Sequence, residues 1–253
     1  MTENVVEIKN LWFSFNGQAV LRGVNLIVPP GDFLVIIGPN GGGKTTLLKL
    51  MLGLLQPDRG SVKIFGRSPE SAVQQVGYVP QNALINKSFP VSVLEVVLMG
   101  RLRSSGRWLH HTRGDRLAAQ AALERMQVGD CSLRKMDEIS GGQLQRVLIA
   151  RALVSNPRAL FLDEALANVD IPGRGGFYEI LKELNKTVTI VAVSHDMMII
   201  SSHAKSVACI NRELYYHDSG EITQEMMDFA YQCPVDLIAH GVPHRVLSRH
   251  KEN

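Results

Sequence analysis

The sequence is poor in cysteine and has no long apolar run. Cys131, Cys209 and Cys233 are the three cysteines among 253 residues. Their spacing fits neither a disulfide framework nor a zinc site, so we expect free thiols in a reducing compartment. The longest apolar stretches, 47–55 and 188–193, fall far short of the roughly 20 residues that a membrane-spanning helix needs. These shortages exclude a disulfide-stapled domain and an integral membrane protein.

A strong excess of one charge is also missing. The 27 lysines and arginines are offset by 24 acidic residues, which leaves a net charge of +3. This excess is too small to indicate nucleic-acid binding, so we expect no such partner. The N-terminal Met-Thr-Glu-Asn-Val-Val has no basic leader and no apolar core, and we expect no signal peptide. The length suits one large α/β domain or two small ones.

Short apolar, β-branched segments alternate with segments of helical spacing. We expect strands at 5–8, 21–28, 33–37, 62–65, 76–79, 159–162 and 187–193, helices at 44–55, 92–99 and 116–126, a turn at 56–60, and a closing hairpin of 207–211 with 214–217. This alternation predicts a mostly parallel sheet with helices on both faces. Between about 88 and 155 no strand pattern occurs, which predicts an inserted helical subdomain.

A glycine cluster follows the expected strand 33–37. Gly38-Pro-Asn-Gly-Gly-Gly-Lys-Thr45 fits the Walker A pattern, with a strand before it and a helix after it. Glycines let the backbone N–H groups surround a phosphate, and the helix N-terminus adds a positive dipole end. We expect Lys44 to reach the β- and γ-phosphates and the Thr45 hydroxyl to bind Mg²⁺. The expected ATP-binding residues of this loop are Gly38, Pro39, Asn40, Gly41, Gly42, Gly43, Lys44, Thr45 and Thr46.

Two acidic residues, Asp163 and Glu164, end the apolar strand expected at 159–162. This end of a parallel strand lies at the ligand-binding edge of the sheet. We expect Asp163 to hold Mg²⁺ and Glu164 to orient or deprotonate the attacking water, because phosphoryl transfer depends mainly on positioning. A lone Asp-Glu pair would be an ordinary strand terminus, but the Walker A loop in the same chain favours the catalytic interpretation.

The segment Ile139-Ser-Gly-Gly-Gln143 precedes that acidic strand. Ser140 and Gln143 fit a capping box, which is a helix start that needs no ligand. A capping box does not explain Gly141 and Gly142, since a glycine costs roughly 1 kcal/mol within a helix. Glycines at this place allow a phosphate to approach the free N–H groups of the first turn.

The Walker A loop, the Ser-Gly-Gly-Gln segment and the acidic strand end, in this order, resemble the ABC ATPase family over roughly residues 3–222. The resemblance implies an α/β fold with a P-loop NTPase core, a small antiparallel β subdomain and an inserted α-helical subdomain at about 88–155. Residues 223–253 would form a C-terminal extension. It also implies ATP and Mg²⁺ as cofactors, and a head-to-tail homodimer in which residues 140–143 of one subunit face the ATP of the other.

The resemblance assigns roles to residues outside these motifs. Gln81 matches the Q-loop glutamine that senses Mg²⁺ and water, and His195 matches the switch histidine that contacts the γ-phosphate. Asp170 matches the D-loop aspartate, although the residues before it differ from the usual ones. Phe15 matches the aromatic residue that stacks on adenine, but a core phenylalanine is an equally good interpretation. Ala165 replaces the proline that usually follows the glutamate, and this change removes no catalytic group.

The segment Phe89–Arg101 lies where the family docks the coupling helix of a membrane permease. It most resembles the bacterial zinc, manganese and iron importer ATPases, so we expect a peripheral subunit at the cytoplasmic face of the membrane. We expect contact with the permease through 82–101 and an indirect partnership with a substrate-binding protein. Siderophore, haem and cobalamin importers have a similar segment and remain an alternative, while a non-transport ABC ATPase and a small-molecule kinase are less favoured.

Three further features are ambiguous. The basic residues from Arg101 to Arg116 could face permease loops, lipid headgroups or solvent. The tail carries Cys233 and three histidines, but Gly241 and Pro243 interrupt any helix that would align His240 with His244 for metal binding. The glycines within 173–176 disfavour a regular helix start there.

Overall fold

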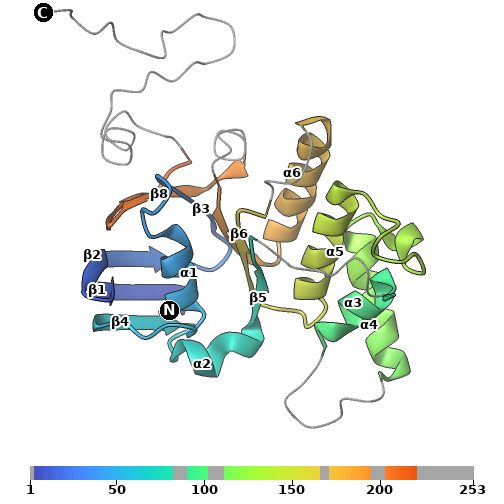
Figure 1. The fold of residues 1–253 in the computed structure, drawn as a ribbon, viewed down its shortest axis with the longest axis horizontal. Helices are drawn as coiled ribbons and strands as arrows, with labels where there is room; N and C mark the ends of the chain where they lie inside the picture. The colour runs from blue at the N-terminus through green and yellow to red at the C-terminus, as the bar shows by residue number, and fades with distance from the viewer. Residues whose placement is uncertain (1–2, 82–89, 102–110, 166–170, 195–202, 221–253) are drawn as a thin grey trace, which may run out of the picture.

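The computed structural model describes residues 3–81, 90–101, 111–165, 171–194 and 203–220. The expected positions His195 and Asp170, residues 82–89 of the expected permease contact, and the tail from 221 therefore lie outside the described residues. The described chain forms two sheets with helices packed around them (Figure 1). The smaller sheet is antiparallel, and its strand order is β2-β1-β4, with β1 at Val6–Phe15, β2 at Gln18–Val28 and β4 at Arg59–Ile64.

The larger sheet has six strands in the order β5-β6-β7-β3-β8-β9. They are β3 (Phe33–Ile37), β5 (Val76–Val79), β6 (Ala159–Asp163), β7 (Thr189–Val193), β8 (Ser206–Asn211) and β9 (Glu213–His217). All neighbours pair in parallel except β8 and β9, which form the expected antiparallel hairpin. Every residue of β3, β6 and β7 is buried, which explains why these strands are continuous apolar runs.

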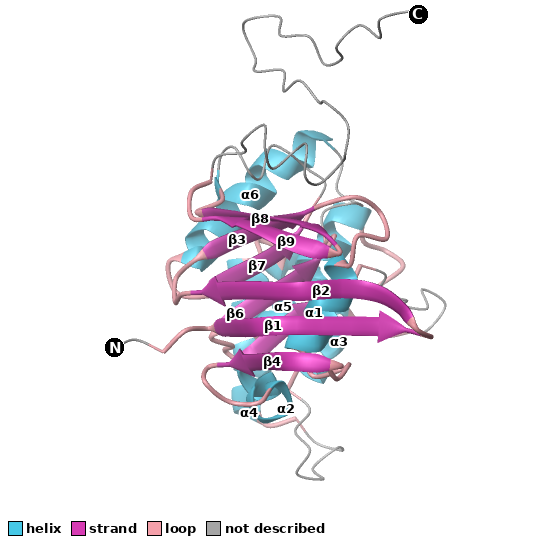
Figure 2. Cartoon of the chain, turned by 90° about the vertical axis from the view of Figure 1, so that its left-hand side faces the viewer, coloured by secondary structure: helices cyan, strands magenta, loops and turns pink. Residues whose placement is uncertain are grey.

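The helices are α1 (Lys44–Met51), α2 (Pro69–Ala72), α3 (Val93–Met99), α4 (Arg113–Arg125), α5 (Gly141–Leu153) and α6 (Ile171–Asn185), with short 3₁₀ turns at Val73–Gln75 and Gly129–Cys131. Helices α3, α4 and α5 lie together on the side of the large sheet opposite the small sheet (Figures 1 and 2). The described residues between β5 and β6 thus form helices rather than strands, as expected. The limits 3–222 and 88–155 stay predictions.

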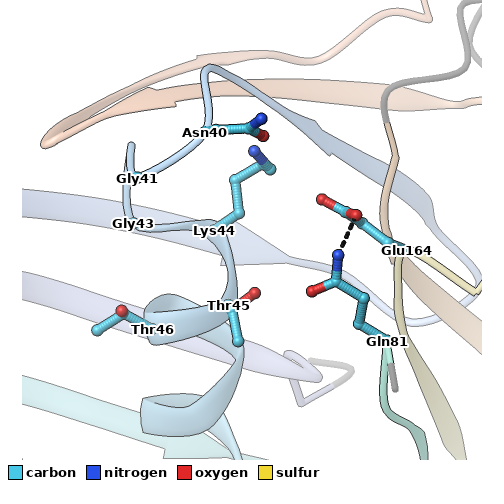
Figure 3. A pocket seen from close by; sticks show the side chains of 8 residues that line it. All are labelled: Asn40, Gly41, Gly43, Lys44, Thr45, Thr46, Gln81 and Glu164. Atoms are coloured by element: carbon cyan, nitrogen blue, oxygen red, sulfur yellow. Dashed lines mark hydrogen bonds between the residues drawn. The ribbon is translucent and has the colours of Figure 1, made fainter. Parts of the chain in front are cut away.

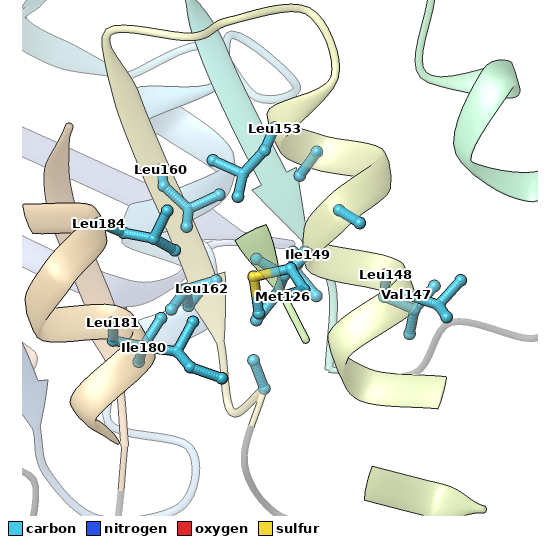
Figure 4. Packing of buried hydrophobic residues seen from close by; sticks show 14 of the residues in the cluster. Met126, Val147, Leu148, Ile149, Leu153, Leu160, Leu162, Ile180, Leu181 and Leu184 are labelled. Carbon is cyan, nitrogen blue, oxygen red and sulfur yellow. The ribbon is translucent and has the colours of Figure 1, made fainter. Parts of the chain in front are cut away.

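The large sheet divides the hydrophobic core into two layers, since successive side chains of a strand point to opposite faces. Phe161 of β6 belongs to the layer shared with the small sheet and α1. Leu160 and Leu162 belong to the other layer, where they lie against Leu181 and Leu184 of α6 (Figure 4). Helix α5 closes this second layer from the opposite side. The two layers hold the carboxyl ends of β3 and β6 at a fixed position.

Some expected boundaries are wrong. Strand β1 continues beyond Ile8 to Phe15, because register shifts and a left-handed Asn10 (φ 44°) interrupt its alternation without ending the pairing with β2. Helix α1 ends at Met51 rather than Leu55, with the left-handed Gly53 (φ 71°) soon after it. Strand β4 begins inside the expected turn. The glycines at 173–176 do not displace the helix start, since α6 runs through them from Ile171.

Candidate nucleotide-binding site

The phosphate loop leaves the carboxyl end of β3 and leads into α1 at Lys44. Gly38 and Gly43 are needed because the loop backbone turns sharply and because neighbouring strands leave no room for a side chain. A Cβ atom on Gly38 (φ 150°) would lie 2.0 Å from the carbonyl oxygen of Ile210 in β8. A Cβ atom on Gly43 (φ 104°) would lie 2.6 Å from a methyl group of Leu21 in β2. The loop is therefore pressed between β8 and the small sheet.

A pocket of about 210 Å³ opens in front of this loop. It is lined by Asn40, Gly41, Gly43, Lys44, Thr45, Thr46, Gln81 and Glu164 (Figure 3). The structure thus brings together most of the expected Walker A residues with the Q-loop glutamine and the acidic strand end. These residues come from four separate stretches of structure, namely the loop, α1, and the ends of β5 and β6.

Lys44 is 6% exposed, and its ammonium group is hydrogen-bonded to the loop backbone. The Nζ atom donates hydrogen bonds to the carbonyl oxygens of Gly38 and Pro39, both at 2.9 Å. Burial lowers the pKa of Lys44, while the nearby carboxylates of Glu164 and Asp163 act in the opposite direction. A cation is therefore held at the mouth of the loop, where it can bind a phosphate.

Asp163 is 1% exposed, at the end of β6. The Thr45 hydroxyl donates a hydrogen bond to its Oδ1 atom at 3.2 Å. Burial raises the pKa of Asp163, whereas the hydrogen bond from Thr45 lowers it. A hydroxyl and a carboxylate oxygen are the hard ligands that Mg²⁺ prefers, and Mg²⁺ sites often use one or two protein oxygens together with substrate phosphates. The donor set that the structure assembles here fits Mg²⁺.

Glu164 follows immediately and adopts a left-handed backbone conformation (φ 46°). Its N–H group donates to the Val193 carbonyl oxygen of β7 at 3.0 Å. Its carboxylate accepts a hydrogen bond from the amide group of Gln81 across the pocket (Figure 3). A non-glycine residue in this region costs about 1–3 kcal/mol and is often retained at functional sites. The backbone turn thus aims the carboxylate at Gln81 and into the pocket.

The segment 140–143 lies at the start of α5, and none of its residues lines this pocket. The expected capping box is confirmed: Gln143 N–H donates to the Ser140 hydroxyl at 3.2 Å, and Ser140 N–H donates to Gln143 Oε1 at 2.9 Å. The space beside Gly142 is open. The Gln143 amide nitrogen also donates to the sulfur of Cys131 at 3.3 Å. The glycine-bearing turn is thus free to meet another molecule.

Phe15 is 49% exposed, so it is not a core residue. Its ring lies edge-on against Phe13, with the ring centroids 4.8 Å apart. Arg101, expected to face a partner or solvent, instead pairs with Asp115 at 2.7 Å inside the helical region. This contact ties the end of α3 to the start of α4.

Two residues near the site had no clear signal in the sequence. Burial and the negative charge of Asp163 raise the pKa of Tyr78 to about 12, so its hydroxyl stays protonated beside that carboxylate. Arg212, between β8 and β9, donates its backbone N–H to the Gly42 carbonyl oxygen at 3.1 Å. Sequence patterns identify the loop but not the strands that press against it.

Comparison with known proteins decides the family. The family model described as ABC transporter matches residues 21–167, which is more than half of the chain. The chain belongs to the ABC transporter family. It is therefore an ATP-binding ATPase of that family.

Relatives of this ABC ATPase cover more than four fifths of its length. It is 36% identical over 228 residues to the zinc uptake system ATP-binding protein ZurA of Listeria innocua, covering 88% of this chain and 89% of the relative. It is 39% identical over 213 residues to the high-affinity zinc uptake system ATP-binding protein ZnuC of Bacillus subtilis, with coverages of 83% and 92%.

A solved structure shares the same fold. It is an inward-facing conformation of an ABC transporter assigned to the metal-chelate type, with a TM-score of 0.83, 27% identity, and coverages of 94% and 93%. Within the described part of this ABC ATPase, no helix has the length and apolar character needed to cross a membrane.

Proposed function

We propose that this chain is the ATP-hydrolysing motor subunit of a bacterial importer for divalent metal ions, with zinc first and manganese or iron as the other candidates. The observation that carries the ATPase part is the convergence of Lys44, Thr45, Gln81 and Glu164 on one pocket. Support for the cargo comes from the relatives, both of which are named as zinc uptake proteins.

We assign the hydrolytic step to residues of this pocket. The loop N–H groups and Lys44 bind the β- and γ-phosphates. Glu164 accepts a proton from a water molecule whose oxygen attacks the γ-phosphorus, and the bond to the bridging oxygen breaks to release ADP. Gln81 holds the Glu164 carboxylate in place by the hydrogen bond between them. Thr45, Asp163 and Gln81 would hold Mg²⁺, which neutralises phosphate charge when it is bound.

The remaining expected residues complete this assignment. His195 contacts the γ-phosphate, Phe15 stacks on the adenine, and Asp170 lies at the subunit interface. Residues 140–143 contact the ATP of a second copy in a head-to-tail homodimer, so that two ATP molecules are enclosed. The exposed, capped start of α5 supports this role, since a helix N-terminus attracts phosphate.

Movement would reach the membrane through the helical region. ATP binding closes the dimer, hydrolysis reopens it, and residues 82–101 pass the motion to a permease at the cytoplasmic face. A substrate-binding protein delivers the cargo to that permease. Residues 3–222 form the ATPase domain in this proposal, with 88–155 as its helical insertion and 223–253 as an extension.

A second candidate is an importer for a siderophore, haem or cobalamin. The specific observation in its favour is the solved transporter assigned to the metal-chelate type, whose fold matches at a TM-score of 0.83.

The ATPase assignment is tested with Glu164→Gln. This variant should bind ATP, hydrolyse it at least 100-fold more slowly, and accumulate as a dimer in size-exclusion chromatography with ATP. Lys44→Ala should fail to bind ATP and stay monomeric. Normal hydrolysis by Glu164→Gln would refute the role of this carboxylate. A phosphorylated small-molecule acceptor without dimerisation would instead identify a kinase.

The cargo is tested by elemental mass spectrometry of metal-limited cells that lack the chain and are complemented with variants. Wild type and Lys63→Ala, an exposed lysine of β4, should restore uptake of one metal, whereas Lys44→Ala should not. If free metals enter equally in all strains while uptake of haem or a siderophore depends on Lys44, the second candidate is correct. Failure to co-purify with a membrane protein would contradict both transport assignments.

A further inference from the structure

Cys131 is fully buried at the end of the 3₁₀ turn Gly129–Cys131, yet its sulfur makes polar contacts. The Gln143 amide nitrogen donates a hydrogen bond to this sulfur at 3.3 Å. The thiol donates in turn to Asp130 Oδ1 at 3.6 Å. A buried free cysteine ordinarily behaves as a small apolar side chain. Cys131 does more than fill space, since it connects the 3₁₀ turn to the start of α5.

The side-chain amide of Gln143 is held at both ends. Its oxygen accepts from the Ser140 N–H at 2.9 Å, while its nitrogen donates to the sulfur of Cys131. Turning the amide over would place an N–H group against the Ser140 N–H and break the capping box. The acceptor at Cys131 therefore selects the amide orientation that caps the helix. The cap in turn fixes the shape of the turn 140–142.

The backbone that carries Cys131 is itself fixed. The Cys131 N–H donates to the Val128 carbonyl oxygen at 3.1 Å, and the next carbonyl oxygen, that of Ser132, accepts from the N–H of Leu94 in α3 at 2.9 Å. Helix α3 also packs against α5. The sulfur is thus presented to Gln143 from a segment that is braced on two sides.

We propose that Cys131 is a positioning residue for the turn 140–142, and that it acts through Gln143. This assignment rests on the proposed function, in which the turn contacts the ATP of a second copy. A contact loses affinity when it must first order a loose turn and a long side chain. Cys131 stays inside its own subunit and keeps the turn in its binding shape before the second copy arrives.

Cys131→Ala and Cys131→Ser separate this role from core packing. The two replacements are nearly equal in size, but serine keeps a hydrogen-bond acceptor. Both should lower the melting temperature by similar amounts. In a Glu164→Gln background, Cys131→Ala should weaken the ATP-bound dimer about fivefold at each of its two symmetric sites, or roughly 25-fold in the dissociation constant, whereas Cys131→Ser should stay within about threefold of the parent. Analytical ultracentrifugation with ATP measures this constant.

Three further measurements make the result specific. The dissociation constant for MgADP, measured by calorimetry on the single chain, should be unchanged in Cys131→Ala, because the phosphate loop of that chain is not altered. Cys209→Ala removes an equally buried sulfur from the same core layer and should leave the dimer unchanged. In a chain that already carries Gln143→Ala, Cys131→Ala should cause no further loss of dimer, because the two residues act as one unit.

The outcomes are distinguishable. Equal dimer stability in Cys131→Ala and Cys209→Ala would overturn the proposal. Equal losses in Cys131→Ala and Cys131→Ser would also overturn it, because packing alone would then explain them, and so would a parallel loss of MgADP affinity or a full further loss in Gln143→Ala. If the Glu164→Gln chain with Cys131 intact formed no dimer with ATP, the contact between copies would itself be wrong, and the role of Cys131 would fail with it.

Discussion

Replacing Gly38 by alanine tests how tightly β8 presses on the phosphate loop. The new methyl carbon would lie 2.0 Å from the Ile210 carbonyl oxygen, whereas ordinary contacts begin near 3.4 Å. Loop and strand would have to separate, although both belong to a packed core. Gly41 is the matched control, because it also has positive φ (79°) but has no atom within 4 Å of an added Cβ.

The two costs can be compared from these contacts. Gly41→Ala should lower the free energy of unfolding by about 1 kcal/mol, mainly because alanine is strained in the left-handed region. Gly38→Ala has two costs, a backbone conformation that favours glycine and a steric clash with the Ile210 carbonyl oxygen. We expect these to lower the free energy of unfolding by about 4 kcal/mol in total. For a chain of this size the difference corresponds to a melting temperature lower by on the order of 10 °C.

Scanning calorimetry without nucleotide is the appropriate assay, because altered ATP binding then cannot enter the comparison. The reasoning would be refuted if the two alanine variants melted within about 2 °C of each other. Such a result would mean that β8 yields to the methyl group, and that the contact does not fix the loop.

Three further predictions concern other parts of the chain. Ser140→Ala removes the cap of α5 and should lower the free energy of unfolding in urea by about 1 kcal/mol, whereas Ser140→Thr should not. Burial raises the pKa of Asp32 above its unfolded value. The free energy of unfolding should therefore fall as pH rises from 3.8 through the folded pKa, because the folded state holds the proton more tightly. Asp32→Asn should remove this fall in melting curves measured across that pH range. Burial also raises the pKa of Cys131, and that of Cys209 to about 12; in a Cys233→Ser background, Ellman's reagent should label these thiols only after unfolding.

The sequence allowed good prediction of elements whose signals are local. Strands such as Phe33–Ile37 and Val76–Val79 are short apolar segments bounded by a polar residue on one side and by glycine or proline on the other, and the structure has them with the same limits. The capping box at the start of α5 depends on residues three apart in sequence, and it too is confirmed. Its function, like that of the other site residues, stays a prediction.

Features that depend on distant contacts were harder to predict. Spacing along the chain does not show that β3 lies between β7 and β8, because strand order is set by how connections cross the sheet. The left-handed turn at Arg212 also has no sequence signal, since Asn-Arg-Glu is not a turn signature. The contact of Ile210 with Gly38 follows from both of these and could not be predicted from either segment alone.

The position of β3 has a consequence for synthesis on the ribosome. The phosphate-loop motif is complete once residue 45 has been made, but the strands on both sides of β3 belong to the last third of the described chain. A nascent chain that has not yet released β7 and β8 therefore carries an unsupported, strongly apolar strand. Such non-local pairing is slow and leaves an aggregation-prone edge exposed during elongation. We expect truncated chains ending before residue 206 to need chaperone protection, and ATP binding to begin only when the final hairpin has emerged.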